Sequence, residues 1–223
     1  MTDSAPGVLF DVDGTLLDTN YLHVLAWAQA FRDTGHAGIA MSTLHRAIGI
    51  GSEELVARIL GEPSGDEVEA AVEAHSRRFE ALRDQALAFP SAGDLLRACA
   101  DRGLRVVLAT SGQKSDLDWM LPAIGADEAV HGATTSSDVS TAKPSPDLLR
   151  VAMEQHDLDP DRTAVVGDTV WDVESASRAG LPCVALLCGG ISEGELSEAG
   201  ARAVFQDPAD LLDRLAASPL GDL

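Results

Sequence analysis

The sequence predicts an α/β fold in which a doubly wound parallel sheet carries an inserted domain of helices. From residue 89 onward, helical patterns alternate with short apolar runs, as in a parallel sheet covered by helices on both faces. Residues 18–87 show only helical patterns, and polar clusters directly follow three of the apolar runs. We therefore expect a Rossmann-like core from residues 1–17 and 88–223, with an α-helical cap domain from residues 18–87 between its first two strands.

The first predicted strand is the apolar run at residues 8–10, which continues into Asp11-Val12-Asp13-Gly14-Thr15. On a continuing strand, residues two apart point to the same side, so Asp11 and Asp13 can face one site. Gly14 then allows a sharp turn. Two carboxylates at a strand end suit a divalent cation together with a nucleophile and its acid/base partner. The alternative is an ordinary turn, because Asp and Gly are common turn residues.

The inserted segment has apolar residues at helical spacing, starting after Asp18-Thr19. Ser42 can cap a short helix, and Asp66 can cap a long one. The expected helices cover residues 21–34, 42–48, 52–60 and 66–85. Residues 17–20 and 87–91 are the expected hinges of a mobile cap.

Downstream of the cap, the expected strands cover residues 104–109, 129–131, 163–166, 183–187 and 203–205. The expected helices cover residues 92–102, 115–121, 146–155, 172–179 and 208–217. Thr110-Ser111-Gly112 directly follows one of these strands, and Gly167-Asp168-Thr169-Val170-Trp171-Asp172 follows another. Ligands of open parallel sheets bind beyond the carboxyl ends of the strands, so these clusters are candidate site residues. Lys143, in Lys143-Pro144-Ser145-Pro146, lies between them in sequence.

The chain is strongly acidic, with 36 acidic and 16 basic residues and a formal net charge of −20. This charge disfavours nucleic acid and anionic membranes as partners, because both require cationic surfaces. A phosphate pocket must then be built locally from cations. Only Lys114 and Lys143 are lysines, and a lysine in K-P-x-P indicates a site that uses a compact point charge.

The remaining composition predicts a cytoplasmic protein. Residues 1–4 lack the basic start and apolar stretch of a signal peptide, and the longest apolar run, residues 181–187, is too short to span a bilayer. The cysteines, Cys99, Cys183 and Cys188, form no C-x-x-C pair, so we expect buried thiols. We expect a monomer or a weak dimer.

The order D-x-D-G-T, strand then T-S, K-P-x-P, and G-D-x-x-x-D resembles the haloacid dehalogenase-like hydrolase superfamily over nearly the whole chain. The start of the cap resembles the helical-cap phosphatase branch, which includes phosphoglycolate phosphatases and β-phosphoglucomutases. The resemblance implies that Asp11 is the nucleophile and that Mg²⁺ is held by Asp11, the backbone carbonyl of Asp13, and Asp168. Asp172 then orients these ligands, with an N-cap of the following helix as its alternative role.

The same resemblance assigns the other site residues. Asp13 is the general acid and base, and because dehalogenating members lack this second aspartate, dehalogenation is disfavoured. Thr110 binds the transferring phosphoryl group, helped by backbone N–H groups near Ser111 and Gly112, although a helix cap is the alternative for Thr110. Lys143 bridges Asp11 and the phosphate.

His23 is at a spacing that, in β-phosphoglucomutases and related phosphatases, places a substrate-side histidine near the hinge. A packed or surface histidine is the alternative. Other cap residues depart from the mutase pattern: residues 49–52 contain no arginine, and the later helix has His75, Arg77 and Arg78 near the position of a mutase lysine.

These features predict a Mg²⁺-dependent phosphatase that hydrolyses a small phosphorylated metabolite through an aspartyl-phosphate. A β-phosphoglucomutase-like isomerase is the first alternative, because it would keep Asp11 and Asp13. A non-catalytic binding or regulatory protein on the same fold is the second. The complete set of Asp11, Asp13, Lys143 and Asp168 argues against it.

Overall fold

The computed structural model describes residues 4–223 and divides the chain into two compact units. The core unit combines the chain up to Asp18 with Leu87–Leu223, and the helical unit is Thr19–Ala86. Residues 1–3, which contributed to the expectation of no signal peptide, lie outside the described part. None of the helices in residues 4–223 has the length and apolarity that crossing a membrane requires.

The core unit is built on a six-stranded parallel sheet in the order β3-β2-β1-β4-β5-β6, which confirms the predicted fold class. The strands are β1 (Ala5–Phe10), β2 (Arg105–Ala109), β3 (Gly132–Thr134), β4 (Leu158–Gly167), β5 (Cys183–Leu186) and β6 (Ala203–Phe205). β1 is central, with β2 on one side and β4 on the other. The strand order reverses around β1, where ligands of such sheets bind.

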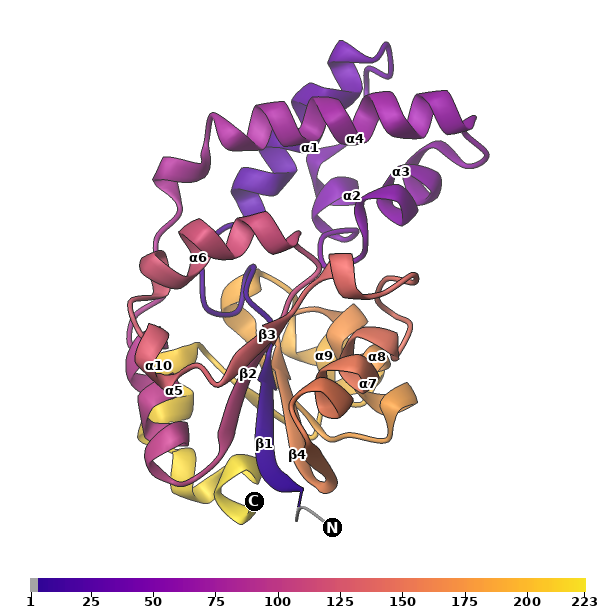
Figure 1. Cartoon of the computed structure of the whole chain (residues 1–223). Helices are drawn as coiled ribbons and strands as arrows, with labels where there is room; N and C mark the ends of the chain where they lie inside the picture. Colours follow the sequence, from indigo (N-terminus) through magenta and orange to yellow (C-terminus); the bar gives the residue numbers. More distant parts are fainter. Residues whose placement is uncertain (1–3) are drawn as a thin grey trace. The chain divides into compact units, whose positions relative to one another are not determined.

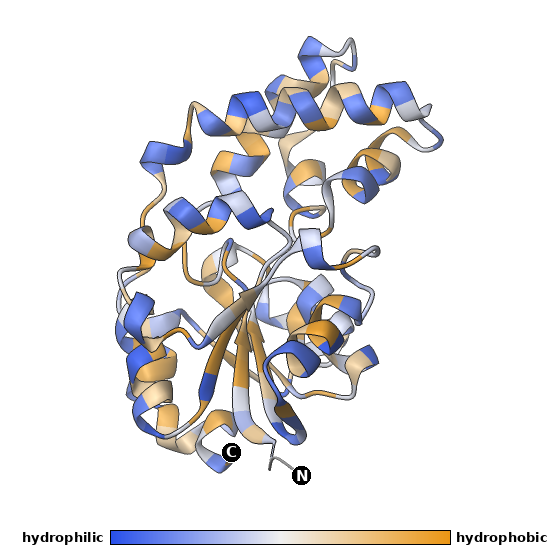
Figure 2. Ribbon diagram, viewed as in Figure 1, coloured by the Kyte–Doolittle hydropathy of each residue, from blue (hydrophilic) through white to orange (hydrophobic). Residues whose placement is uncertain are grey.

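Both faces of the sheet are covered by helices (Figure 1). Val8 and Phe10 pack on the face covered by α5 (Ala92–Asp101), α6 (Leu117–Ile124) and α10 (Pro208–Asp213). Leu9 packs on the face covered by α7 (Asp147–Gln155), α8 (Val170–Ala179) and α9 (Glu193–Ala199). Because both faces are buried there, the central strands are hydrophobic toward their carboxyl ends, whereas the exposed residues 160–162 of β4 are polar (Figure 2).

The helical unit contains α1 (Asn20–Asp33), α2 (Met41–His45), α3 (Ser52–Leu60) and α4 (Gly65–Glu80). The predicted cap of α4 at Asp66 is wrong. Ser64 is the N-cap, and its N–H donates to Glu67 Oε2 at 2.8 Å while its hydroxyl accepts from the Glu67 N–H. α4 also ends before the predicted Gln85, and a separate 3₁₀ turn follows at Arg83–Gln85.

Several elements of the core also differ from their predicted positions. β3 begins three residues later than expected, because residues 127–129 form a 3₁₀ turn and pairing with β2 starts only where the His131 N–H donates to Val106 O at 2.8 Å. α9 was not predicted. The last helix ends at Asp213 instead of Ala217, and a 3₁₀ turn follows at Leu215–Ala217. The other 3₁₀ turns are Lys114–Asp116, Ser136–Asp138, Leu187–Gly189 and Pro219–Asp222.

The three cysteines are free thiols. Cys99 and Cys183 are buried as expected, whereas Cys188 is half-buried. Burial raises the pKa of the Cys99 thiol to about 12, so this cysteine is an inert packing residue.

The two backbone segments that flank the helical insertion pair with each other. Leu17 and Ala88 form an antiparallel bridge. The Asp18 N–H donates to Leu87 O at 2.8 Å, and the Phe89 N–H donates to Leu16 O at 2.9 Å. The two ends of the insertion are therefore fixed to each other within the core.

Candidate active site

Three neighbouring strands deliver the predicted site residues to one edge of the sheet. Asp11 follows β1, Thr110 follows β2, and Asp168 follows β4. The Asp11 N–H donates to Val166 O of β4 at 2.9 Å, and the Thr110 N–H donates to Thr134 O of β3 at 3.1 Å. Ladder hydrogen bonds thus fix the backbone where each site residue leaves its strand.

The segment after Asp11 folds back in a tight turn. Gly14 has a φ of +78°, as its predicted role in the turn requires. Its N–H donates to Leu17 O at 2.8 Å, and the Leu17 N–H donates to Val12 O at 3.0 Å. The turn holds Asp13 half-buried beside the more deeply buried Asp11.

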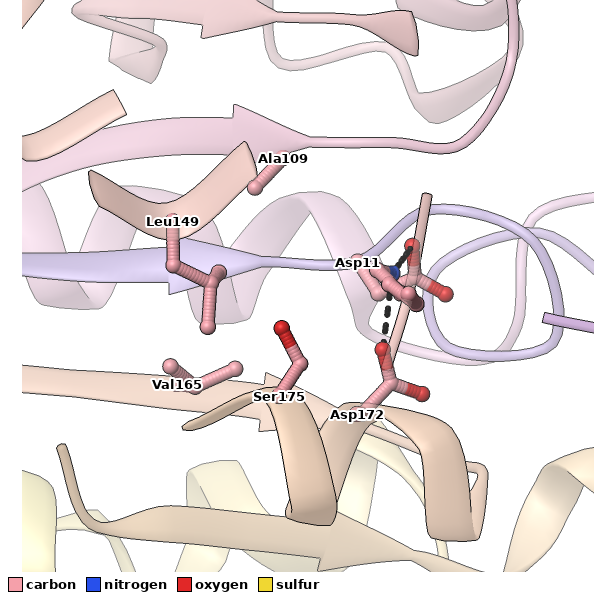
Figure 3. A pocket seen from close by; sticks show the side chains of 7 residues that line it. Asp11, Ala109, Leu149, Val165, Asp172 and Ser175 are labelled. Atoms are coloured by element: carbon pink, nitrogen blue, oxygen red, sulfur yellow. Dashed lines mark hydrogen bonds and ion pairs between the residues drawn. The ribbon is translucent and has the colours of Figure 1, made fainter. Parts of the chain in front are cut away.

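Lys143 joins two carboxylates in the interior of the core. Its Nζ donates to Asp11 Oδ1 and to Asp172 Oδ1, each at 2.7 Å, and its side chain is only 2% exposed. Figure 3 shows Asp11 and Asp172 converging on this amine, with Ala109, Leu149 and Val165 lining the same small pocket. The apolar neighbours keep the local dielectric constant low, which strengthens the attraction between these charges.

Burial raises the pKa of the Asp11 carboxyl from 3.8 to about 7, an effect that Lys143 opposes and Asp172 reinforces. Burial alone would favour the neutral amine of Lys143. The charges of Asp11 and Asp172 outweigh it, so the pKa of Lys143 lies above its usual 10.5. Lys143 is therefore the buried cation that opposes the rise in the pKa of Asp11.

Two residues whose roles were not predicted determine how the Asp168 carboxylate is accommodated. The Thr15 hydroxyl donates to Asp168 Oδ1 at 2.8 Å, and both side chains are completely buried. On the other side, a Cβ on Gly189 would lie 1.7 Å from Asp168 Oδ2, so a side chain there would displace the carboxylate. Thr15 belongs to the D-x-D-G-T motif and could have been found from it. Gly189 gives no such signal.

Asp172 is not the N-cap of α8, which was its alternative role. Thr169 is the N-cap, and its hydroxyl accepts from the Asp172 N–H. Asp172 Oδ2 accepts in return from the Thr169 hydroxyl at 2.6 Å and from the Thr169 N–H at 3.0 Å. Gly167 makes room for this arrangement, because a Cβ there would lie 2.5 Å from the Asp172 carboxyl carbon.

Asp11, Asp168 and Asp172 form a buried carboxylate cluster whose nearest oxygens lie within 4.8 Å of one another. All its donors are oxygens, which suits a hard cation such as Mg²⁺. Both oxygens of Asp172 are engaged by Lys143 and Thr169. Asp11 and Asp168 are thus the better placed ligands, and the backbone carbonyl of Asp13 stays a predicted one.

Thr110 is fully buried, and its hydroxyl oxygen accepts from the Gly112 N–H at 2.9 Å. This contact orients the hydroxyl so that its own hydrogen can be donated elsewhere. The alternative role of Thr110 as a helix cap is wrong, because Gln113 caps the 3₁₀ turn that follows. The Gly112 carbonyl is fixed by the N–H and the hydroxyl of Ser136, at 3.0 and 2.9 Å. The loop containing Ser111 is thereby held at the end of β2.

His23 lies in the helical unit, where it packs against other aromatic rings. Its Nδ1 is 3.2 Å from Nε2 of His75, and its ring stacks on Phe79 with 3.9 Å between centroids. His75 also stacks on Trp27 at 4.0 Å. His23 is therefore a packed histidine, which was the alternative to a substrate-side role. A role of His23 in substrate binding stays a prediction.

Comparison with known proteins shows similarity to hydrolases and phosphatases over most of the chain. Residues 6–180 match the model of the haloacid dehalogenase-like hydrolases. A phosphoglycolate phosphatase of Rhodospirillum rubrum is 30% identical over 218 residues, which cover 93% of this chain and 90% of that protein. A validoxylamine A 7'-phosphate phosphatase of Streptomyces hygroscopicus is 30% identical over 80% of this chain and 84% of its own length. The crystal structure of a hydrolase from Pseudomonas syringae superposes with a TM-score of 0.90 at 35% identity, covering 95% of this chain and 98% of that one.

Proposed function

Because this chain belongs to the haloacid dehalogenase-like hydrolases, we propose that its phosphatase activity acts on a small phosphorylated metabolite, requires Mg²⁺ and proceeds through an aspartyl-phosphate. The observation that carries the proposal is the buried Lys143 between Asp11 and Asp172, next to Asp168 at the ends of neighbouring strands. A carboxylate attacking a phosphate dianion meets strong repulsion. This cluster combines the nucleophile with a cation that reduces that repulsion.

In the first step, a carboxylate oxygen of Asp11 attacks phosphorus, and the bond from phosphorus to the alcohol oxygen breaks. Lys143 holds Oδ1 of Asp11, which leaves Oδ2 as the attacking atom and one ammonium N–H for the phosphoryl group. The Thr110 hydroxyl donates to another phosphoryl oxygen. Both donors are held in place before the substrate arrives, so they require little reorganisation during the reaction.

Asp13 moves the protons in this mechanism. It protonates the departing alkoxide in the first step and then removes a proton from the water that attacks the aspartyl-phosphate. The bond from phosphorus to Asp11 breaks, which releases inorganic phosphate and restores the carboxylate. Asp13 is more exposed than Asp11, as a residue that exchanges protons with water requires.

Asp11 and Asp168 would hold the Mg²⁺ ion together with the Asp13 carbonyl. When bound, the ion supplies positive charge that offsets the charge of the phosphate. The hydrogen bond from Thr15 keeps Asp168 in one orientation, and Asp172 holds Lys143 rather than the ion.

Replacing Asp168 with asparagine is expected to weaken Mg²⁺ binding by about 100-fold or more, because one of few anionic ligands is lost. Calorimetric titration with Mg²⁺ measures the affinity, and phosphate release at rising Mg²⁺ gives the matching activation constant. Asp161→Asn removes a carboxylate from the exposed part of β4 and is the control. An unchanged Mg²⁺ affinity in Asp168→Asn would remove Asp168 from the metal site.

Water is the proposed acceptor of the phosphoryl group. A mutase must hold a second phosphate with cations, and the later helix of the helical unit offers His75, Arg77 and Arg78 near the position of a mutase lysine. His75 is buried in the aromatic stack. Arg77 pairs with Glu73 at 2.8 Å, and Arg78 forms two hydrogen bonds with Asp33, at 2.7 and 2.9 Å. All three have partners within their own unit, which supports a phosphatase over an isomerase.

The acceptor is tested with β-glucose 1-phosphate and a trace of the 1,6-bisphosphate. We expect inorganic phosphate to be released without accumulation of glucose 6-phosphate. Isomerisation with little phosphate released would show that the enzyme is a mutase. A panel that includes phosphoglycolate and several sugar phosphates then identifies the substrate by kcat/KM. No release from any member would point to a binding protein.

A further inference from the structure

One face of α8 contacts three consecutive residues of the segment that carries Lys143. Asp172, Ser175 and Arg178 are spaced three residues apart, so they line one side of the helix. Asp172 Oδ1 accepts from Lys143 Nζ at 2.7 Å. In the next turns, Ser175 donates to Ser145 O at 2.8 Å, and Arg178 donates to Pro144 O at 2.8 Å.

The contacts of Ser175 and Arg178 with this segment are each restrained by their surroundings. Ser175 is completely buried, so its hydroxyl bond is protected from competition by water. The Arg178 guanidinium is oriented by Glu174, whose Oε2 lies 2.9 Å from Nη2. Arg150 of α7 donates in turn to the Arg178 carbonyl at 3.3 Å. Ser175 and Arg178 donate to backbone carbonyls next to Lys143, so both can act on the site through the chain at residues 143–145.

We infer that Ser175 and Arg178 are positioning residues that set where the Lys143 amine lies. The side chain of Lys143 is long and has several rotatable bonds, so its amine is placed only as well as its backbone is held. Fixing Pro144 and Ser145 on the helix that also carries Asp172 makes the lysine and its carboxylate partner one rigid unit. A shift of this unit would displace the amine from Asp11, and displacements of about 1 Å in a catalytic constellation can cost about 100-fold in rate.

This inference rests on the proposed role of Lys143, so its test includes a readout that does not depend on catalysis. The chain has only two lysines, Lys114 and Lys143. Lys114 is exposed and Lys143 is buried. Reductive methylation followed by peptide mass spectrometry therefore reports the protection of Lys143, with Lys114 as an internal reference in the same sample.

In Arg178→Ala and Ser175→Ala we expect Lys143 to be methylated at least about tenfold faster than in the parent, because local opening becomes easier. We expect kcat to fall about 10- to 100-fold, with KM changing less than about twofold. Arg178→Lys keeps a hydrogen-bond donor, so it should partly restore both the protection of Lys143 from methylation and kcat. Arg178 is half exposed, so its alanine variant tests the inference even if Ser175→Ala does not fold.

Arg162→Ala is the matched control. Arg162 also donates to a backbone carbonyl, Ser4 O at 2.8 Å, and pairs with a nearby carboxylate, Asp159, at a similar exposure. Arg162→Ala should leave both the methylation rate of Lys143 and kcat unchanged. If Lys143 in Arg178→Ala is as slowly methylated as in the parent, the inference is overturned, whatever the activity. If protection is lost while kcat is unchanged, α8 positions Lys143 but the proposed catalytic role of Lys143 is wrong.

Discussion

Asp11→Asn is expected to abolish phosphate release, with kcat falling by about four powers of ten or more. An amide cannot form the acyl phosphate that the proposed mechanism requires. Its carbonyl oxygen can still accept the hydrogen bond that Lys143 donates to Asp11 Oδ1. The loss should therefore fall on the chemical step, with the fold retained.

The variant is assayed for phosphate release in saturating Mg²⁺, and circular dichroism checks its fold. Asp161→Asn, which removes a carboxylate from an exposed part of β4, serves as the control and should keep full activity. Trapping of a phosphorylated protein by rapid acid quench should succeed with the parent enzyme and fail with Asp11→Asn. Near-normal turnover of the folded, metal-loaded variant would falsify the assignment of the nucleophile.

Lys143→Met is expected to reduce both activity and stability. Methionine fills much of the same volume but leaves Asp11 and Asp172 facing each other without their cation. Breaking a buried ion pair on one side costs about 3–5 kcal/mol of unfolding free energy. The loss of a donor to the phosphoryl group should lower kcat by about a further 1,000-fold in a folded sample.

The stability loss should depend on pH in a defined direction. The folded-state pKa of Asp11 is already raised to about 7 by burial, and removal of Lys143 takes away the main influence that lowers it. The folded state then binds more protons than the unfolded state, so stability falls as pH rises through neutrality. Urea denaturation in EDTA should show a larger deficit at pH 8 than at pH 6. Lys114→Met, which removes the exposed lysine, is the control and should show little loss at either pH.

Much of the core could be predicted because its signals are local. The apolar runs that became β1, β2, β4 and β5 are each followed by a turn or a polar cluster, and parallel strands must end at the same edge of the sheet. That rule alone brings Asp11, Thr110 and Asp168 together. Lys143, which no strand directly precedes, was placed in the same site by the resemblance of the four ordered motifs to a known family.

What could not be predicted depends on contacts across the chain or on weak local signals. α9 buries only Leu196, so it has almost no apolar periodicity, although Ser192 and Glu195 form a capping box. Nothing between Glu80 and Gln85 breaks a helix in sequence, so the end of α4 is decided by packing. Gly189 is required by a carboxylate more than 20 residues away, a relationship that only the folded chain reveals.

The backbone pairing of residues 16–18 with 87–89 makes the helical unit an exchangeable module. Because the two junctions already lie side by side, residues between them can be lengthened, replaced or shortened to a turn without breaking a sheet hydrogen bond. The closure entropy of such an insertion grows only slowly with its length. A change within this insertion can thus leave unchanged the strands that carry Asp11, Thr110 and Asp168.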